Sequence, residues 1–237
     1  MGVVVDVRDA EVGEAAVDRV FDWLRLVDET FSTYKPESQI CRLDRGELSL
    51  ADVHPDVRAV LRRCDELREE THGYFDARAG GHLDPSGLVK GWSVDRGAAI
   101  LERAGARNFA IYAGGDVVVR GGALPADCWH VGIRHPHRPD RLAATVTARD
   151  LAIATSGTYA RGDHVLDPHT RRTPAGLLSM TITGPELATA DAYATAAFAM
   201  GAERGPAWTA RLDGYEAMTI RADETTLSTP GFPALEQ

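Results

Sequence analysis

Segments with helical periodicity alternate with short β-branched runs along the whole chain, and this alternation limits the folds that the chain can adopt. Apolar residues recur at steps of three and four over residues 14–31, and again after Pro55, which suits a first helical turn because proline has no N–H. Two further helices are predicted over 93–104 and 186–200, each closed by a glycine. Strands are predicted over residues 3–8, 108–112, 117–120, 129–133, 144–147, 178–183, 217–220 and 225–227.

The alternating elements lack the phosphate-binding fingerprints of the parallel nucleotide-binding folds. Neither a GxGxxG motif nor a GxxxxGK[ST] loop occurs in the sequence, and no linker long enough to separate domains is present. A chain of 237 residues can bury one substantial core. We therefore expect a single compact α+β domain over residues 1–237, with interleaved helices and mixed or antiparallel sheets. A pseudo-duplicated form of this domain stays open as an alternative.

The acidic balance of the chain limits its partners. The formal net charge is −9, whereas a nucleic-acid or anionic-membrane surface needs clustered Lys and Arg. An anionic cofactor is compatible with this charge, because backbone N–H groups and a metal ion can bind phosphates. The opening MGVVVDVRDAEVGEAA has neither the basic nor the apolar region of a signal peptide, and no apolar run reaches the ~18 residues of a membrane helix. We therefore expect a cytoplasmic protein with no nucleic-acid partner and no membrane anchor.

The last predicted helix carries a lone acidic side chain among small ones. Asp191 and Thr195 are four residues apart and project from one side of the helix, and most residues around them are alanine. Carboxylate and hydroxyl oxygens suit a hard cation such as Mg²⁺ or Ca²⁺. The alternative is a surface aspartate beside a threonine that bonds to its own helical turn. The spacing alone leaves both interpretations open.

Two glycine-rich segments place carboxylates beside exposed backbone. In LDPSGLVKGWSVD, Asp84 and Asp95 flank Lys90, and the proline and glycines predict a tight bend before the next helix. Ser93 is the expected N-cap of that helix, with Asp95 in its first turn. In YAGGD, Asp116 follows a double glycine at a strand end, where a turn exposes backbone groups. The alternative for the first segment is an ordinary loop with a surface lysine.

A third segment, IATSGTYARGDHVLDP, combines small residues with a histidine. Ser156 and Gly157 belong to a TSG sequence that we interpret as a turn, whose N–H groups could hold a phosphate. His164 could act as a general base, because histidine titrates near neutral pH. A structural or solvated histidine is the alternative.

The order of these segments resembles that of the ApbE-type flavin transferases. The matching segments are STYKPES, THGYFD, a D-x-x-G-x-x-K-G-x-x-x-D box over residues 84–95, AGGD, a tryptophan before a V-G-I strand, TSG-x-Y, H-x-x-D-P and an A-D-A-x-x-T helix. They extend over most of the chain, from about residue 1 to residue 201. One departure is that only seven residues separate Asp76 from Asp84, where the family usually has several tens. A cap or loop of the family is therefore missing here.

The resemblance implies a role for each matching residue. Asp191 and Thr195 would bind Mg²⁺ together with the backbone carbonyl of Gly87. His164 lies at the position of the family's proposed base, so His164 and Asp191 are the expected catalytic residues. Val165 would pack near the flavin or the adenine. The FAD site would be lined by Tyr34, Tyr74, Phe75, Asp76, Asp84 and Lys90. We also expect glycine-rich turns to converge around the pyrophosphate of FAD. These turns would bring Asp116, Ser156 and Gly157 into the FAD site.

The chemistry implied by the resemblance is a Mg²⁺-dependent phosphoryl transfer. A threonine oxygen of an acceptor protein would attack the FMN phosphorus of FAD, which is a substrate here, and AMP would leave. FMN would stay attached to the acceptor through a phosphodiester. Two alternatives are an FAD pyrophosphatase, which uses water in place of threonine, and a flavin-binding protein without turnover.

Overall fold

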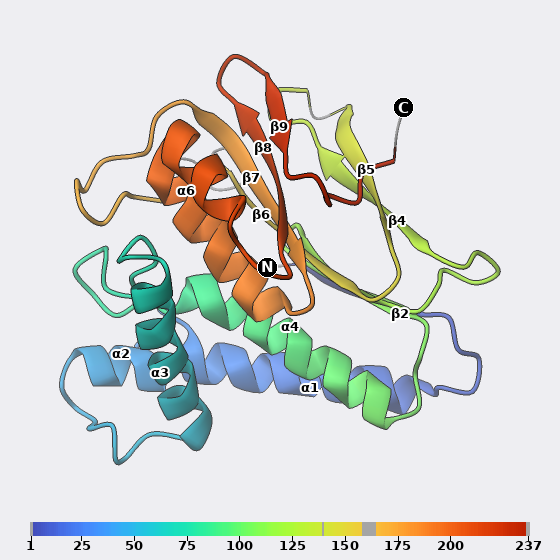
Figure 1. Ribbon diagram of the computed structural model, residues 1–237. Helices are drawn as coiled ribbons and strands as arrows, with labels where there is room; N and C mark the ends of the chain where they lie inside the picture. Colours follow the sequence, from blue (N-terminus) through green and yellow to red (C-terminus); the bar gives the residue numbers. More distant parts are fainter. Residues whose placement is uncertain (1, 139, 158–164, 236–237) are drawn as a thin grey trace.

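The computed structural model describes residues 2–138, 140–157 and 165–235. Seven strands form one antiparallel sheet in the order β1-β2-β3-β6-β7-β8-β9, and β4 and β5 form a separate antiparallel pair (Figure 1). The strands are β1 (Val3–Val7), β2 (Phe109–Ala113), β3 (Asp116–Arg120), β4 (Trp129–Arg134), β5 (Leu142–Ala148), β6 (Leu151–Gly157), β7 (Leu177–Gly184), β8 (Glu216–Arg221) and β9 (Thr226–Ser228). The helices are α1 (Glu14–Phe31), α2 (Gln39–Asp44), α3 (Pro55–Glu70), α4 (Ser86–Arg103) and α6 (Leu187–Thr209). The mixed helix and antiparallel-sheet fold confirms the predicted α+β class.

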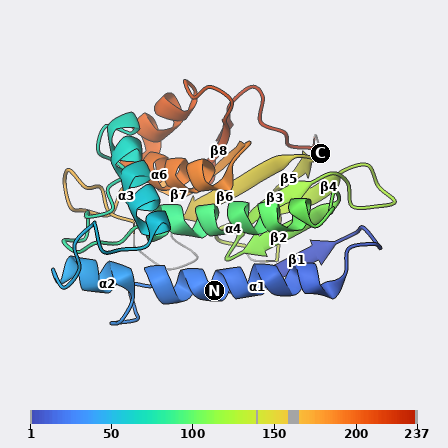
Figure 2. The same cartoon turned by 90° about the horizontal axis from the view of Figure 1, so that it is seen from below.

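The two faces of the large sheet are covered by different elements. Helices α1, α4 and α6 lie against one face, and their apolar stripes pack on strand residues such as Ile111 and Ile182 (Figure 2). The β4–β5 pair covers the other face, where Trp129 and Val146 meet strand residues such as Ile153. Helix α3 packs beside α1 and α4 in a smaller apolar cluster. None of the helices in the described ranges is long and apolar enough to cross a membrane.

The connectivity of the sheet repeats once. In the first half, β1 is followed by helices ending with α4, and then by the β2–β3 hairpin beside β1. In the second half, β7 is followed by α6, and then by the β8–β9 hairpin beside β7. Strand β6 joins the two halves between β3 and β7. This is the connectivity that a pseudo-duplicated domain would have.

Two sequence predictions about local structure are wrong, and both concern segments that carry candidate site residues. Helix α4 begins at Ser86 and not at 93, so that Gly87, Lys90 and Gly91 are helical and Ser93 is no N-cap. Glycine weakens a helix, but here α4 approaches α6 so closely that only glycine fits. The TSG sequence lies in strand β6, which pairs with β7, and forms no turn. Its small residues therefore pair with those of the neighbouring strand inside the sheet.

Helices α4 and α6 are joined at their crossing point by reciprocal contacts. A Cβ added at Gly91 would lie 2.5 Å from the carbonyl oxygen of Leu187, so the two backbones touch there. Asp95, predicted in a first turn, lies inside α4 and accepts hydrogen bonds from the backbone N–H groups of Leu187 (3.1 Å) and Ala188 (2.8 Å). These are first-turn groups of α6 that have no partner within the helix. Asp95 therefore caps the neighbouring helix rather than its own.

Replacing Asp95 by alanine should lower the free energy of unfolding by about 1–2 kcal/mol, as loss of an N-cap does, because two N–H groups of α6 lose their acceptor. Asp95→Asn keeps one acceptor oxygen and should cost less. Urea titration of the three proteins tests this. Equal stability of wild type and Asp95→Ala would show that water satisfies these N–H groups.

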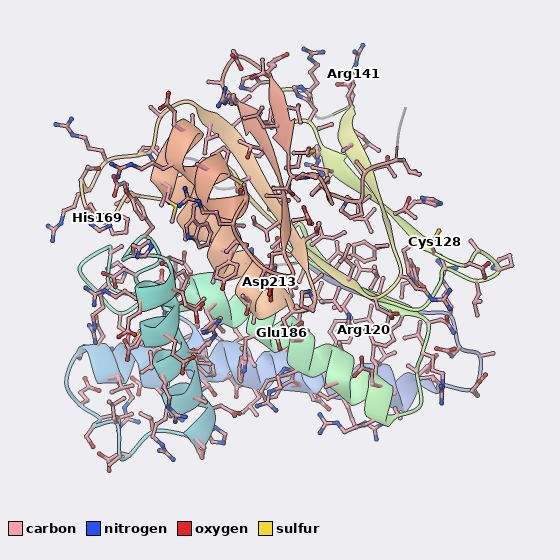
Figure 3. All side chains as sticks on the ribbon, viewed as in Figure 1. Arg120, Cys128, Arg141, His169, Glu186 and Asp213 are labelled. Atoms are coloured by element: carbon pink, nitrogen blue, oxygen red, sulfur yellow. The ribbon has the colours of Figure 1, made fainter. Side chains whose placement is uncertain are left out.

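The stability contributed by Asp95 should also depend on pH. Burial raises the pKa of Asp95 to about 6, although the two backbone hydrogen bonds act to lower it. The charge of Glu186 also raises this pKa, and that of Arg120 lowers it (Figure 3). The folded protein therefore binds this proton more tightly than the unfolded chain. Stability should rise as the pH falls from 7 toward 4 and decline as the pH rises through about 6. Asp95→Asn should lack this component, and identical pH profiles for the two proteins would contradict the assignment.

Candidate active site

A cavity of about 720 Å³ opens where α1, α4 and α6 meet the ends of β1 and β6. It brings together residues that the sequence placed in separate segments. The predicted residues that line it are Tyr34, Tyr74, Phe75, Asp76, Asp84, Gly87, Lys90, Ser156, Gly157, Val165, Asp191 and Thr195. Asp116 lies just behind this lining, in contact with Lys90. The predicted base, His164, falls outside the described residues.

A lysine and two carboxylates form the charged floor of the cavity. Lys90 Nζ lies 2.6 Å from Asp116 Oδ2 and 3.2 Å from Asp191 Oδ1. Asp116 is 0% exposed and Asp191 is 3% exposed, whereas the Lys90 side chain keeps access to the cavity. Because α4, β3 and α6 each contribute one group, the cluster exists only in the folded chain.

Backbone hydrogen bonds fix both carboxylates of this cluster. The N–H of Thr155 in β6 donates to Asp116 Oδ1 over 3.1 Å. The N–H of Gly91 in α4 donates to Asp191 Oδ2 over 3.3 Å. Each carboxylate therefore has one oxygen toward Lys90 and the other toward a backbone donor, and the backbone donor fixes its orientation.

Electrostatics in this cluster favour an additional cation. Burial raises the pKa of Asp191. The positive charge of Lys90 lowers this pKa, and the negative charge of Asp116 raises it. Burial acts to lower the pKa of Lys90, but the two carboxylates outweigh it and raise that pKa above its ordinary value. When all three groups are ionised, two carboxylates face the ammonium group of Lys90. Buried carboxylates of this kind are stabilised by a nearby cation.

Neutral oxygen atoms complete the inner end of the cavity. Thr195 Oγ1 lies one helical turn from Asp191 and 3.3 Å from Ser156 Oγ of β6. A Cβ added at Gly87 would lie 3.8 Å from Thr195 Oγ1 and 3.1 Å from Phe75 Cε2, so the backbone of α4 comes close only because this residue is glycine. No group of three or more His, Cys, Asp or Glu residues in the described ranges could hold a metal ion by itself. One carboxylate with neutral oxygen atoms is a donor set that Mg²⁺ can use together with substrate phosphates.

Apolar and aromatic side chains contribute to two walls of the cavity. One wall comes from the end of α1 and the loop after it, with Phe31 and the 92% exposed Tyr34. The sequence predicted Phe31 only as part of an apolar stripe facing the core. Its position four residues beyond Val27 gave no sign that the stripe continues into a ligand cavity. A second wall consists of Tyr74, Phe75 and residues 165–168.

The pairing of Lys90 with Asp116 is another feature that sequence reasoning missed. Both residues were predicted to lie in turns exposed to a ligand, and Asp116 is instead fully buried against Lys90. A usable signal was present, since Asp116 continues directly into the apolar run Val117–Val119 of a buried strand. A carboxylate at the start of a buried strand needs a partner, and Lys90 supplies a cation to it.

Comparison with solved structures places this fold among flavin transferases. The structure titled Flavin Transferase ApbE from Vibrio cholerae superimposes with a TM-score of 0.86 over 98% of this chain and 95% of that chain, at 21% sequence identity. The ApbE protein of Thermotoga maritima gives a TM-score of 0.87 over 96% of this chain and 93% of that chain, at 20% identity. At these identities the likeness establishes the fold.

The sequence profile of the ApbE family matches residues 1–81 and 77–219, which together make up most of the chain. This chain belongs to the ApbE family. A Treponema pallidum relative named FAD:protein FMN transferase is 31% identical over 208 residues, which is 80% of this chain and 57% of the relative. The chain thus spans about half the length of the curated relatives that it matches. The two profile segments overlap at residues 77–81, between Asp76 and Asp84.

Proposed function

We propose that this chain transfers FMN from FAD to a threonine hydroxyl of an acceptor protein and releases AMP. The observation that carries this proposal is the Lys90–Asp116–Asp191 cluster at the floor of the cavity. A volume of about 720 Å³ lies within the range of cofactor sites, about 300–1,000 Å³. The name of the Treponema pallidum relative supports the same reaction.

The residues at the floor of the cavity suit a pyrophosphate ligand. Lys90 offers a positive charge to the cavity while Asp116 and Asp191 hold its position. Asp191 and the hydroxyl of Thr195 would hold Mg²⁺ together with the carbonyl of Gly87. When bound, this ion would neutralise charge on the pyrophosphate and fix its geometry. The aromatic and apolar walls suit the ring systems of FAD.

In the proposed reaction, the threonine oxygen forms a bond to the FMN phosphorus as the bond from that phosphorus to the AMP oxygen breaks. AMP leaves with the bridging oxygen, and the hydroxyl proton passes to a base. His164 stays the predicted base. The acceptor would approach at the open end of the cavity, where Tyr34 is exposed.

Incubating the protein with FAD and Mg²⁺, with and without the acceptor domain of a known flavinylated protein, should test the proposal. We expect AMP and protein-bound flavin in equal amounts, only when the acceptor is present and not after addition of EDTA. The measurements are AMP and free FMN by chromatography and bound flavin by in-gel fluorescence. NAD, which also contains a pyrophosphate, is the matched control substrate.

The other outcomes of this experiment identify the alternatives. AMP together with free FMN in the absence of acceptor would indicate an FAD pyrophosphatase. Binding of FAD without AMP release would indicate a flavin-binding protein without turnover. Binding of NAD in preference to FAD would contradict any flavin-specific function.

A further inference from the structure

Three segments that are distant in the sequence meet at Tyr74, on the wall of the cavity. Arg204, from the part of α6 beyond Gly201, donates a hydrogen bond from Nη1 to the Tyr74 hydroxyl over 2.7 Å. The His169 ring packs edge-on against the Tyr74 ring, with 4.6 Å between the ring centroids. Figure 3 shows His169 on the loop that precedes β7, beside the turn that follows α3. The Tyr74 ring is thus fixed both at its hydroxyl and along its side.

His169 also contacts the backbone next to Tyr74. Its Nε2 lies 3.1 Å from the carbonyl oxygen of His72. Because a carbonyl oxygen only accepts hydrogen bonds, this nitrogen carries the ring proton and is the hydrogen-bond donor. Gly73 makes the close approach possible, because its φ is +83° and a Cβ there would lie 3.2 Å from His169 Cε1. We call His72, Tyr74, His169 and Arg204 the Tyr74 cluster.

The Tyr74 cluster connects two parts of the cavity wall. Tyr74 lines the cavity, and so do Val165, Leu166 and Pro168, which come directly before His169 in the chain. Both contacts of His169 therefore hold the 165–168 segment against the Tyr74 segment. His169 and Arg204 are themselves exposed and are not among the residues that line the cavity. Any influence that they have on a ligand in the cavity must pass through this wall.

We propose that His169 and Arg204 are positioning residues that set the FAD affinity of the cavity by holding Tyr74 and the 165–168 segment in place. The proposal rests on the proposed function, since it takes FAD as the ligand. A wall that is already ordered binds a ring system more tightly than one that must be ordered on binding. Because His169 and Arg204 do not line the cavity, they should act on FAD binding and leave the chemical step unchanged.

Replacing His169 by alanine should raise the Kd and KM for FAD about three- to tenfold, the range expected for one lost hydrogen bond and ring contact, with kcat within about twofold of wild type. His169→Gln should restore part of the affinity, since its amide can donate to the His72 carbonyl. His137→Ala, which removes an exposed histidine on the β4–β5 connection, is the matched control and should bind FAD like wild type. Quenching of flavin fluorescence gives Kd, and AMP release gives KM and kcat.

The hydrogen bond between Arg204 and Tyr74 allows a second, independent test. Arg204→Met and Tyr74→Phe each remove this bond, and each should raise the Kd for FAD about threefold. The double variant should bind no more weakly than either single variant, because both substitutions remove the same interaction. Additive effects would show that the two side chains act separately on FAD.

The results that would overturn the proposal differ from those that would overturn the proposed function. Wild-type FAD affinity in both His169→Ala and Arg204→Met would exclude a positioning role. So would a parallel loss of melting temperature, affinity and kcat without rescue by His169→Gln, which would indicate a purely structural contact. The fluorescence titration needs no turnover, so it decides this question even if the wild type binds FAD without releasing AMP.

Discussion

Replacing Asp191 by alanine should reduce AMP release from FAD at least ~100-fold, equivalent to about 2.7 kcal/mol, while the protein stays folded. Asp191 is the charged group among the proposed ligands of Mg²⁺, and it also holds Lys90 at the cavity floor. Its removal takes away both the metal-binding charge and the second contact of Lys90. Titration of AMP release with Mg²⁺ should show that higher metal concentrations restore only part of the activity.

The same substitution should be harmless to stability, which is an unusual expectation for a buried charge. With Asp191 present, two carboxylates share one lysine, and burial disfavours the ionised form of Asp191. Without it, Lys90 keeps its ion pair with Asp116. The melting temperature should therefore stay close to that of wild type or rise. A higher melting temperature of the variant would show that Asp191 lowers the stability of the wild-type protein in exchange for its function in the site.

Two further variants make the Asp191 prediction decisive. Asp191→Asn keeps the size of the side chain and its acceptor for the Gly91 N–H, so it should fold like wild type and lose activity like Asp191→Ala. Asp18→Ala, on the exposed side of α1, should change neither property. Wild-type turnover of Asp191→Asn at low Mg²⁺ would show that the metal assignment is wrong. An unfolded Asp191→Ala protein would show that the role of Asp191 is structural.

Gly91→Ala should lower the free energy of unfolding by about 1–3 kcal/mol, although alanine is the better helix former by about 1 kcal/mol. The added Cβ would lie 2.5 Å from the Leu187 carbonyl oxygen and 2.8 Å from Ala188 Cα. Both obstacles are backbone atoms of α6, so no side-chain rotation can relieve the clash. The helices must move apart, and for a chain of this size each kcal/mol should lower the melting temperature by roughly 2–4 °C.

Gly97→Ala in the same helix is the matched control. It brings the same gain in helix propensity, but its Cβ would meet the Val20 Cγ1 atom at 3.1 Å, which is a side-chain methyl that can shift. We expect Gly97→Ala to be clearly less destabilising than Gly91→Ala. Because Lys90 and Asp191 lie at the same crossing, Gly91→Ala should also weaken FAD binding. Equal stability of the two variants would show that the α4–α6 contact yields more easily than its geometry indicates.

Much of the secondary structure follows from local sequence signals. The apolar stripe over residues 14–31 has the bounds of α1, and Pro55 is the first residue of α3. The β-branched runs correspond to β1, β3, β7 and β8 within about two residues. These elements were predictable because each carries its own periodicity and its own start or stop signal.

Local signals failed where tertiary contacts outweigh residue propensity. Gly87 and Gly91 argue against a helix by themselves, yet both are helical. The backbone of α6 leaves no room for a Cβ at Gly91, and the Phe75 ring makes the space at Gly87 tight. Ser156 and Gly157 resemble a turn, yet they pair with β7 in the middle of the sheet. In both places small residues mark close approach between elements rather than flexibility.

By itself, the sequence determined which residues we propose for the site, and that they belong to one α+β domain of a recognisable family. The identities and spacings of these residues are local properties of the sequence. They can be read from the ordered motifs between STYKPES and the segment that contains Asp191. Only the tertiary structure decided that Lys90 stands between Asp116 and Asp191, and that His169 and Arg204 hold Tyr74. Those partners come from α4, β3, α6 and loops, up to 130 residues apart. No local pattern encodes which of several charged groups will meet once the core has packed.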